Sequence, residues 1–257
     1  MSEAAILEID GLNAAYGQAQ ILFDVSLVLA HGEVGALMGR NGAGKSTIFN
    51  MVGGQLAPDA GRVLLAGRDI TAAPARRIWR LGVGRTFQIA QTFVSMTVAE
   101  NVQMALISRH GRTRAFWPSA HALYRDEALA LLERLTLRAD ADRPCSELAY
   151  GDVKRVELAI ALAGAPKLLL MDEPTAGMAP SERNELMQLA ATIARERAIG
   201  ILFTEHDMHA VFGHADRVIV LVRGEIIIAG SPQEVRADRQ VRRAYLGEGL
   251  RLRGGHE

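Results

Sequence analysis

The sequence predicts an α/β protein with a parallel sheet core, an antiparallel β subdomain at its N-terminus and an inserted α-helical subdomain. Short apolar runs alternate with segments of helical spacing, which is typical of a parallel sheet covered by helices. Between them, over about 89–165, the strand signal fades and helical stretches dominate. We therefore expect a core of about 1–88 and 166–235, the insertion, and a C-terminal extension of about 236–257.

The first thirty residues predict the antiparallel β subdomain. Apolar residues alternate with other residues on both sides of a turn at Tyr16-Gly17. This alternation is the pattern of half-buried strands. We expect two paired strands to open the chain.

Three short apolar runs predict the strands of the core: residues 34–38, 168–171 and 201–204. Helical spacing follows the first run over 46–52 and the second from about Ser181. Because helices separate these strands along the chain, we expect them to lie parallel in one sheet.

The insertion and the C-terminal part carry weaker signals. Helical stretches cover 98–107, 125–135 and 152–164. The Arg223-Gly224 pair between two apolar runs predicts a hairpin, and a polar helix follows Pro232.

The composition excludes several classes of protein. The chain has 257 residues with 29 Lys+Arg and 29 Asp+Glu, so it lacks the basic excess of a typical nucleic-acid binder. A single cysteine, Cys145, excludes an internal disulfide and a four-cysteine zinc site, and it fits a reducing compartment. The N-terminus lacks the basic region of a secretory signal, and no apolar stretch approaches the ~18 residues of a spanning helix. We expect any membrane part to come from another chain.

The strongest motif is a glycine-rich loop between a predicted strand and a predicted helix. Gly39-Arg40-Asn41-Gly42-Ala43-Gly44-Lys45-Ser46 fits the phosphate-loop pattern G-x-x-x-x-G-K-[ST]. Glycines let backbone N–H groups face an anion, and the helix N-terminus adds positive charge. Lys45 would neutralise phosphate charge, Ser46 would ligate Mg²⁺, and Thr47 offers another hydroxyl. The alternative is a chance glycine-rich turn, which the flanking strand and helix disfavour.

Two adjacent acids supply the other half of a nucleotide site. Asp172 and Glu173 follow the apolar run 168–171. Asp172 is placed to hold the metal through its water shell, and Glu173 to orient or deprotonate an attacking water. Alone, such a pair is more often a solvated turn or a helix N-cap. A GTPase is disfavoured because the chain has no N-K-x-D motif.

With these motifs, nearly the whole chain resembles the ATP-binding subunit of an ABC transporter, which implies a RecA-like P-loop NTPase core. Tyr16 matches the family's adenine-stacking aromatic residue. Gln88, at the end of Arg85-Thr86-Phe87-Gln88, matches the Q-loop glutamine that reaches Mg²⁺ and the attacking water. His206 matches the switch histidine near the γ-phosphate. Taken singly, these residues are more often sheet packing, a solvated glutamine and a packed or surface histidine.

The family signature corresponds to Leu148-Ala149-Tyr150-Gly151-Asp152, which in the family faces the γ-phosphate held by the opposite subunit. The usual serine is replaced by Ala149 and the usual glutamine by Asp152, whose negative charge is unexpected near a triphosphate. A backbone contact from Gly151 survives both changes. We expect a weaker signature interaction and slower hydrolysis.

The D-loop corresponds to Ala176-Gly177-Met178-Ala179-Pro180. Many family members carry an aspartate at the position of Ala179. That aspartate helps the two nucleotide sites communicate, so this chain lacks one of the groups that couple the two sites in the family. This version of the loop is similar to that of the branched-chain amino acid importer ATPases. The segments 85–88, 205–208 and 241–248, the tyrosine of the signature and the linker with Phe116-Trp117-Pro118 resemble the same subgroup.

The resemblance implies a peripheral ATPase at the cytoplasmic face of the inner membrane. Two subunits, identical or different, would trap two ATP·Mg²⁺ head to tail. The helical insertion would dock a transmembrane permease that an extracytoplasmic binding protein supplies with branched-chain or other hydrophobic amino acids. Within the family, urea or amide transport and lipopolysaccharide export are the alternatives.

A soluble ABC ATPase of another class is a more distant alternative. Such proteins usually carry a long coiled coil or tandem ATPase halves, and the sequence shows neither. The basic run 109–114 could touch nucleic acid, but a solvated loop is favoured and we expect no nucleic-acid partner.

Overall fold

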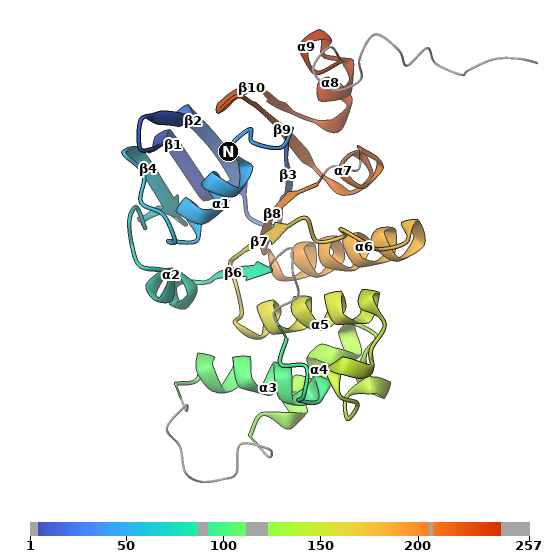
Figure 1. Ribbon diagram of the computed structural model, residues 1–257. Coiled ribbons are helices and arrows are strands. Elements are labelled where there is room, and N and C mark those ends of the chain that lie inside the picture. The colour runs from blue at the N-terminus through green and yellow to red at the C-terminus, as the bar shows by residue number, and fades with distance from the viewer. Residues whose placement is uncertain (1–4, 87–91, 112–122, 206–207, 243–257) are drawn as a thin grey trace, which may run out of the picture.

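The computed structural model describes residues 5–86, 92–111, 123–205 and 208–242 (Figure 1). Its strands are β1 Ala5–Tyr16, β2 Ala19–Ala30, β3 Val34–Gly39, β4 Ala60–Leu65, β5 Arg68–Asp69, β6 Val83–Thr86, β7 Leu168–Asp172, β8 Gly200–Thr204, β9 Arg217–Val222 and β10 Glu225–Gly230. Its α-helices are α1 Lys45–Val52, α2 Ala75–Leu81, α3 Val98–Arg109, α4 Arg125–Arg134, α5 Tyr150–Ala163, α6 Pro180–Arg197, α7 Met208–His214, α8 Pro232–Ala237 and α9 Arg239–Val241.

The N-terminal strands form an antiparallel sheet in the order β2-β1-β4-β5. β1 pairs with β2 across a tight turn and with β4 along its other edge. The expected antiparallel opening is confirmed. Sequence reasoning missed β4 and β5, which are short and carry little alternation.

A second sheet has six strands in the order β10-β9-β3-β8-β7-β6. The five strands β9, β3, β8, β7 and β6 run parallel to one another, and β10 pairs antiparallel with β9. The predicted parallel pairing of the three core strands and the C-terminal hairpin are confirmed. β6, which the sequence did not reveal, forms the edge next to β7.

The strands β3, β7, β8 and β9 of the six-stranded sheet are buried on both faces. In β7, Leu168 and Leu170 pack with α1 and the antiparallel sheet. Leu169 and Met171, which alternate with them, pack toward the helices α3 to α6. Figure 1 shows α3, α4 and α5 below the sheet and α6 to its right, with α1 beside β1 and β2. Burial on both faces explains why the core strands are continuous apolar runs.

The described helices of the insertion lie at the predicted places, with one shifted start. α5 begins at Tyr150, two residues before the expected start at Asp152. Ala149 precedes it in an extended conformation and acts as the N-cap. Gly151 hid this boundary, because glycine has a poor helix propensity. Along the described chain, no helix combines the length and apolar character needed to cross a membrane.

Replacing Thr97 with alanine should lower the free energy of unfolding by about 1 kcal/mol, because it removes the N-cap of α3. The Thr97 Oγ1 accepts a hydrogen bond from Glu100 N (3.2 Å), and Glu100 Oε2 accepts one from Thr97 N (2.8 Å). Urea unfolding measures the loss. Thr192→Ala, on the exposed side of α6, is the matched control and should change stability by less than about 0.5 kcal/mol. Equal effects of the two variants would contradict the capping role.

Candidate functional site

The glycine-rich loop turns from the end of β3 directly into α1. Gly42 and Gly44 have φ values of 79° and 109°, in the left-handed region that other residues rarely adopt. A Cβ on Gly44 would also lie only 2.5 Å from the Cδ2 of Leu22. Glycine at these positions therefore lets the loop close tightly in front of the helix N-terminus, as an anion-binding loop requires.

Lys45 lies buried at the start of α1. Its Nζ donates hydrogen bonds to the carbonyl oxygens of Gly39 (2.6 Å) and Arg40 (3.4 Å). Burial lowers the pKa of Lys45, and the carboxylates of Glu173 and Asp172 oppose that shift. The two acids at the end of β7 thus act electrostatically on the lysine of the loop.

A cavity of about 610 Å³ lies in front of this loop. It is lined by Tyr16, Ile21, Asn41, Gly42, Gly44, Lys45, Ser46, Thr47 and Glu173. Its volume is in the range of small-molecule sites. Tyr16, at the end of β1, is 53% exposed at this cavity. Residues far apart in the sequence, from the antiparallel sheet, the loop and the end of β7, therefore share one site.

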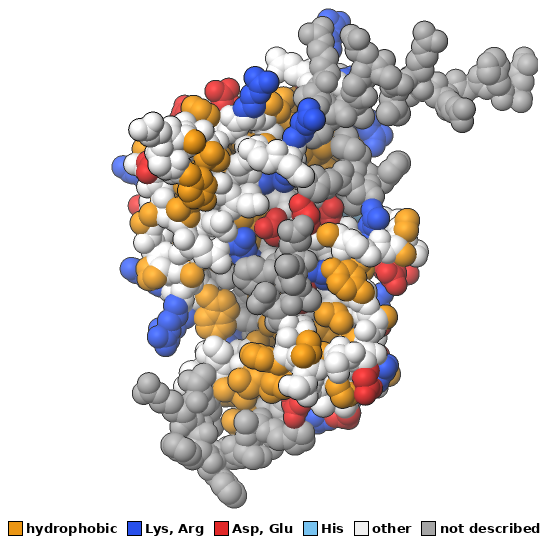
Figure 2. Space-filling model, viewed as in Figure 1, with side chains coloured by type: hydrophobic (Ala, Val, Ile, Leu, Met, Phe, Trp, Pro, Cys, Tyr) orange, Lys and Arg blue, Asp and Glu red, His pale blue; other side chains and the backbone are white. Residues whose placement is uncertain are grey.

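Asp172 ends β7 and is held from two sides. Its Oδ1 accepts a hydrogen bond from Thr204 Oγ1 (2.8 Å), and its Oδ2 lies 3.5 Å from Nη2 of Arg85. Figure 2 shows acidic side chains near the middle of this face, over the part of the sheet drawn as β7 and β8 in Figure 1. The orientation of the carboxylate is thus fixed by β8 and β6.

Glu173 follows Asp172 in a strained conformation. Its φ is 46°, in the left-handed region, which costs an ordinary residue roughly 1–2 kcal/mol. Its backbone N–H donates to Thr204 O (3.1 Å) and Thr204 Oγ1 (3.0 Å), which holds it there. Such strain is found where surrounding structure sets the direction of a functional side chain.

Sequence reasoning missed Thr204 and the role of Arg85. Asp172 and Thr204 lie opposite each other at the carboxyl ends of neighbouring parallel strands. A polar residue ending an apolar strand was the available signal for Thr204. For Arg85 there was none, because its strand was not recognised.

Gln88 and His206 lie outside the described residues, as does the linker with Phe116-Trp117-Pro118. The residue before His206 is described and buried. Glu205 Oε1 accepts hydrogen bonds from Thr175 N (3.0 Å) and Thr175 Oγ1 (2.6 Å). The chain that leads to His206 is thereby attached to the segment that follows Glu173.

The signature residues lie at the N-terminus of α5 and do not line the cavity in front of the phosphate loop. Ala149 caps the helix without a side-chain hydrogen bond. Gly151 packs against Glu182 of α6, whose Cδ would lie 3.3 Å from a Cβ at this position. This helix end and the cavity are separate sites within one chain.

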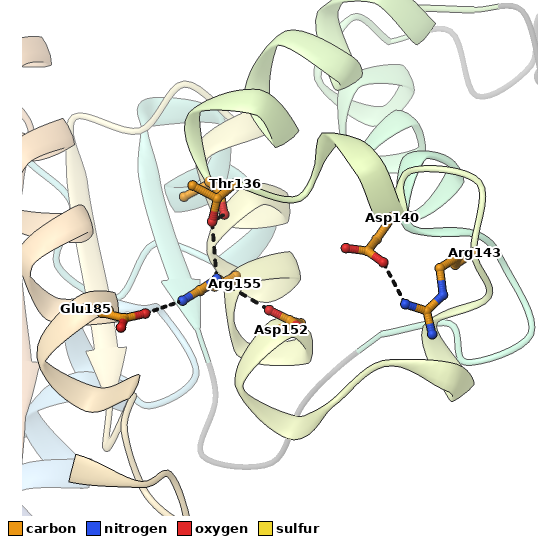
Figure 3. A network of polar contacts seen from close by, with 7 residues as sticks. Thr136, Asp140, Arg143, Asp152, Arg155 and Glu185 are labelled. Atoms are coloured by element: carbon orange, nitrogen blue, oxygen red, sulfur yellow. Dashed lines mark hydrogen bonds and ion pairs between the residues drawn. The ribbon is translucent and has the colours of Figure 1, made fainter. Parts of the chain in front are cut away.

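Asp152 is paired within its own helix (Figure 3). Nη1 of Arg155 lies 3.4 Å from Oδ1 of Asp152 and donates to Thr136 Oγ1 at 3.1 Å. Nη2 of Arg155 donates to Glu185 Oε2 at 2.7 Å. The unusual negative charge of the signature is therefore partly offset by an adjacent guanidinium.

The residues at the cavity fit a nucleoside triphosphate with Mg²⁺. The loop supplies backbone N–H groups, a helix N-terminus and the Lys45 ammonium for the phosphates. Ser46 supplies a hydroxyl at the cavity, and Asp172, next to the cavity residue Glu173, supplies a carboxylate. Mg²⁺ prefers such oxygen ligands. Tyr16 supplies an aromatic surface in the lining of the cavity.

Comparison with known sequences gives two family matches. The family described as ABC transporter matches residues 22–176, and the family described as Branched-chain amino acid ATP-binding cassette transporter matches residues 226–250. The chain is 39% identical over 251 residues to the high-affinity branched-chain amino acid transport ATP-binding protein LivG of Salmonella typhimurium, covering 95% of this chain and 98% of that protein. It is 37% identical to the lipopolysaccharide export system ATP-binding protein LptB of Acidithiobacillus ferridurans, covering 98% and 100%.

Solved structures of ATP-binding cassettes share the fold of this chain. The ADP conformation of MJ1267, an ATP-binding cassette of an ABC transporter, superposes with a TM-score of 0.85 and 31% identity, covering 95% of this chain and 99% of that one. A dimeric post-hydrolysis state of the ATP-binding cassette MJ0796, bound to ADP and phosphate, superposes with a TM-score of 0.74 and 25% identity, covering 88% and 98%.

Proposed function

The chain belongs to the ABC transporter family of ATP-binding proteins, and from that premise we propose that it hydrolyses ATP to power the uptake of branched-chain or other hydrophobic amino acids. The observation that carries the hydrolytic part is the cavity in which Glu173 lies with the phosphate loop. A group that can activate water thereby lies beside the groups that bind phosphate.

Each residue of the site has a proposed role. Glu173 orients the attacking water and accepts its proton, while Lys45 and His206 stabilise charge on the γ-phosphate. Ser46, Asp172 and Gln88 hold Mg²⁺, which when bound supplies positive charge against the phosphate oxygens. Tyr16 stacks on adenine. The rest of the loop, Gly39, Arg40, Asn41, Gly42, Ala43, Gly44 and Thr47, encloses the phosphates.

The signature residues act on the nucleotide of a second subunit. Within one chain, Ala149 and Gly151 lie outside the cavity of the phosphate loop. A head-to-tail pair, homodimeric or heterodimeric, brings the N-terminus of α5 to the partner's γ-phosphate, where a helix dipole favours an anion. The solved dimer of the cassette MJ0796 supports the pairing of two subunits.

A permease docks on the side of the helical insertion. A mostly apolar cavity of about 370 Å³ lies between α2, α3 and α5, and its lining includes Trp79, Ala105 and Ile160. Phe93 and Val94, just before α3, are 58% and 62% exposed. Figure 2 shows hydrophobic side chains over α2 and α3. We assign this groove to a cytoplasmic helix of a membrane subunit, and we propose that the protein works at the cytoplasmic face of the inner membrane.

The transported substrate is proposed from likeness to LivG and from the match of residues 226–250. The similarity to LptB keeps lipopolysaccharide export as the second candidate. Purifying the tagged protein from detergent-solubilised membranes and identifying the attached permease separates the two. Reconstitution with that permease and its extracytoplasmic binding protein should then give ATP-dependent leucine uptake. Recovery of a lipopolysaccharide-export membrane subunit, or uptake of urea but not leucine, would contradict the proposal.

Replacing Ala149 with serine should raise the ATPase rate several-fold and strengthen the ATP-dependent dimer. A serine hydroxyl at the N-cap of α5 can reach the partner's γ-phosphate. As an N-cap it also raises the free energy of unfolding by about 1 kcal/mol. Sedimentation with ATP measures the dimer, and thermal unfolding without ATP measures capping alone. If only the thermal stability rises, the serine is a cap and Ala149 does not limit the signature contact.

A further inference from the structure

The guanidinium of Arg85 joins three elements around the proposed metal site. Its Nη2 lies 3.5 Å from Oδ2 of Asp172, at the end of β7. Its Nη1 donates to Asn50 Oδ1 on α1 at 3.0 Å and to Gln55 just after that helix. Arg85 itself lies on β6, opposite Leu170 of β7.

This contact is largely enclosed. The side chains of Arg85 and Asp172 are only 13% and 17% exposed. The guanidinium also lies 5.9 Å from the ring centre of Phe49 on α1, within the range of a cation–π contact. Burial lowers the pKa of Arg85 and Asp172 opposes that shift, but an arginine stays charged throughout. The guanidinium presents its donors in a rigid planar fork, so it can hold a carboxylate and an amide oxygen in a fixed geometry, whereas a lysine ammonium is a point charge on a flexible stem.

Two of these elements carry proposed ligands of Mg²⁺. α1 carries Ser46 next to Lys45, and β7 ends in Asp172. Thr204 holds one oxygen of Asp172 and Arg85 holds the other, so the carboxylate cannot turn freely. Each oxygen still has a lone pair for a metal-bound water.

We infer that Arg85 is a positioning residue that sets the Asp172 carboxylate and the α1 helix at the spacing needed to hold Mg²⁺. This inference rests on the proposed roles of Ser46 and Asp172. Groups that hydrogen-bond to metal ligands commonly change metal affinity by about 10–100-fold when removed.

The test measures Mn²⁺ binding to the purified protein with a non-hydrolysable ATP analogue, using the electron paramagnetic resonance signal of free Mn²⁺. Arg85→Gln should raise the half-saturating Mn²⁺ concentration about tenfold. Affinity for the analogue in EDTA should change less than about twofold, because the phosphate loop is intact. Arg85→Lys should fall between wild type and Arg85→Gln. Arg68→Gln, on the exposed β5, is the matched control and should bind Mn²⁺ as wild type does.

A double-mutant cycle separates positioning from general damage. In an Asp172→Asn background, Arg85→Gln should change Mn²⁺ affinity by much less than tenfold, because the carboxylate it positions is gone and only its contact with α1 remains. The inference would be overturned if Arg85→Gln weakened Mn²⁺ binding as much in the Asp172→Asn background as in the wild-type background. It would also be overturned if Arg85→Gln alone left Mn²⁺ affinity unchanged. Tighter Mn²⁺ binding in Arg85→Gln would overturn it as well, by showing that Arg85 only repels the metal. If Arg85→Gln does not fold, Arg85→Lys decides by the same measure. A wild-type protein without Mg²⁺-dependent ATPase activity contradicts the proposed function instead.

Discussion

Replacing Glu173 with glutamine should lower the rate of ATP hydrolysis by about 10²–10⁴-fold, the usual contribution of a general base. The amide has nearly the same shape but cannot accept a proton from the attacking water. Glu173 lines the cavity of the phosphate loop, and hydrogen bonds from its backbone to Thr204 hold it there. Release of phosphate under saturating ATP and Mg²⁺ measures the loss.

Nucleotide affinity should be unchanged in the same variant, so bound ATP should accumulate together with the closed dimer. Sedimentation with ATP detects that dimer. Glu225→Gln, on the exposed start of β10, is the matched control and should keep the wild-type rate. A Glu173→Gln protein that turns over ATP at a tenth of the wild-type rate or faster would assign the base to another residue.

Replacing Lys45 with methionine should weaken ATP binding by about 10–100-fold. Hydrogen bonds to charged groups contribute about 1.5–3 kcal/mol, and methionine keeps the length of the side chain but not its charge. The ammonium now donates to Gly39 and Arg40 within the loop, so it is already placed among the groups that enclose phosphate. Titration with a fluorescent ATP analogue gives the affinity.

Lys167→Met provides the control for a lost positive charge, because Lys167 is exposed just before β7. It should bind the analogue like the wild type. Equal affinities for all three proteins would mean that Lys45 does not contact the nucleotide. Thermal unfolding without nucleotide should show whether the Lys45 variant is folded, which separates lost binding from lost structure.

Much of the fold was predictable because the core strands are buried on both faces. Such strands appear as continuous apolar runs. The run 168–171 was therefore recognised as a strand, and the two acids that follow it were placed at its carboxyl end. β6 was missed for the opposite reason. Its sequence, Val83–Thr86, contains a glycine and an arginine and has no apolar run.

The site was predictable where a motif specifies it and less so where it depends on pairing between strands. The phosphate loop is contiguous, so its pattern identified Lys45 and Ser46. Thr204 acts on Asp172 only because β7 and β8 are neighbours in a particular register. Arg85 likewise needs β6 beside β7. Such partners are distant in the sequence and cannot be paired before the sheet order is known.

The signature contains a pair that sequence reasoning overlooked. Asp152 suggested an added negative charge, but Arg155 lies one turn along the same helix and pairs with it. The spacing of three residues was visible in the sequence, and it allows such a pair in any helix. The expected helix of 152–164 already includes both Asp152 and Arg155, so this pair could have been predicted from the sequence.

The cavity draws on both sheets, and this divides recognition of the nucleotide between two parts of the fold. Tyr16 and Ile21 come from the antiparallel sheet, whereas Lys45, Ser46 and Glu173 follow strands of the six-stranded sheet. The side of the cavity proposed to contact the base and the side proposed to act on the phosphates are consequently built by different sheets. We therefore expect substitutions at Tyr16 or Ile21 to alter this side of the cavity and to leave Lys45, Ser46 and Glu173 in place.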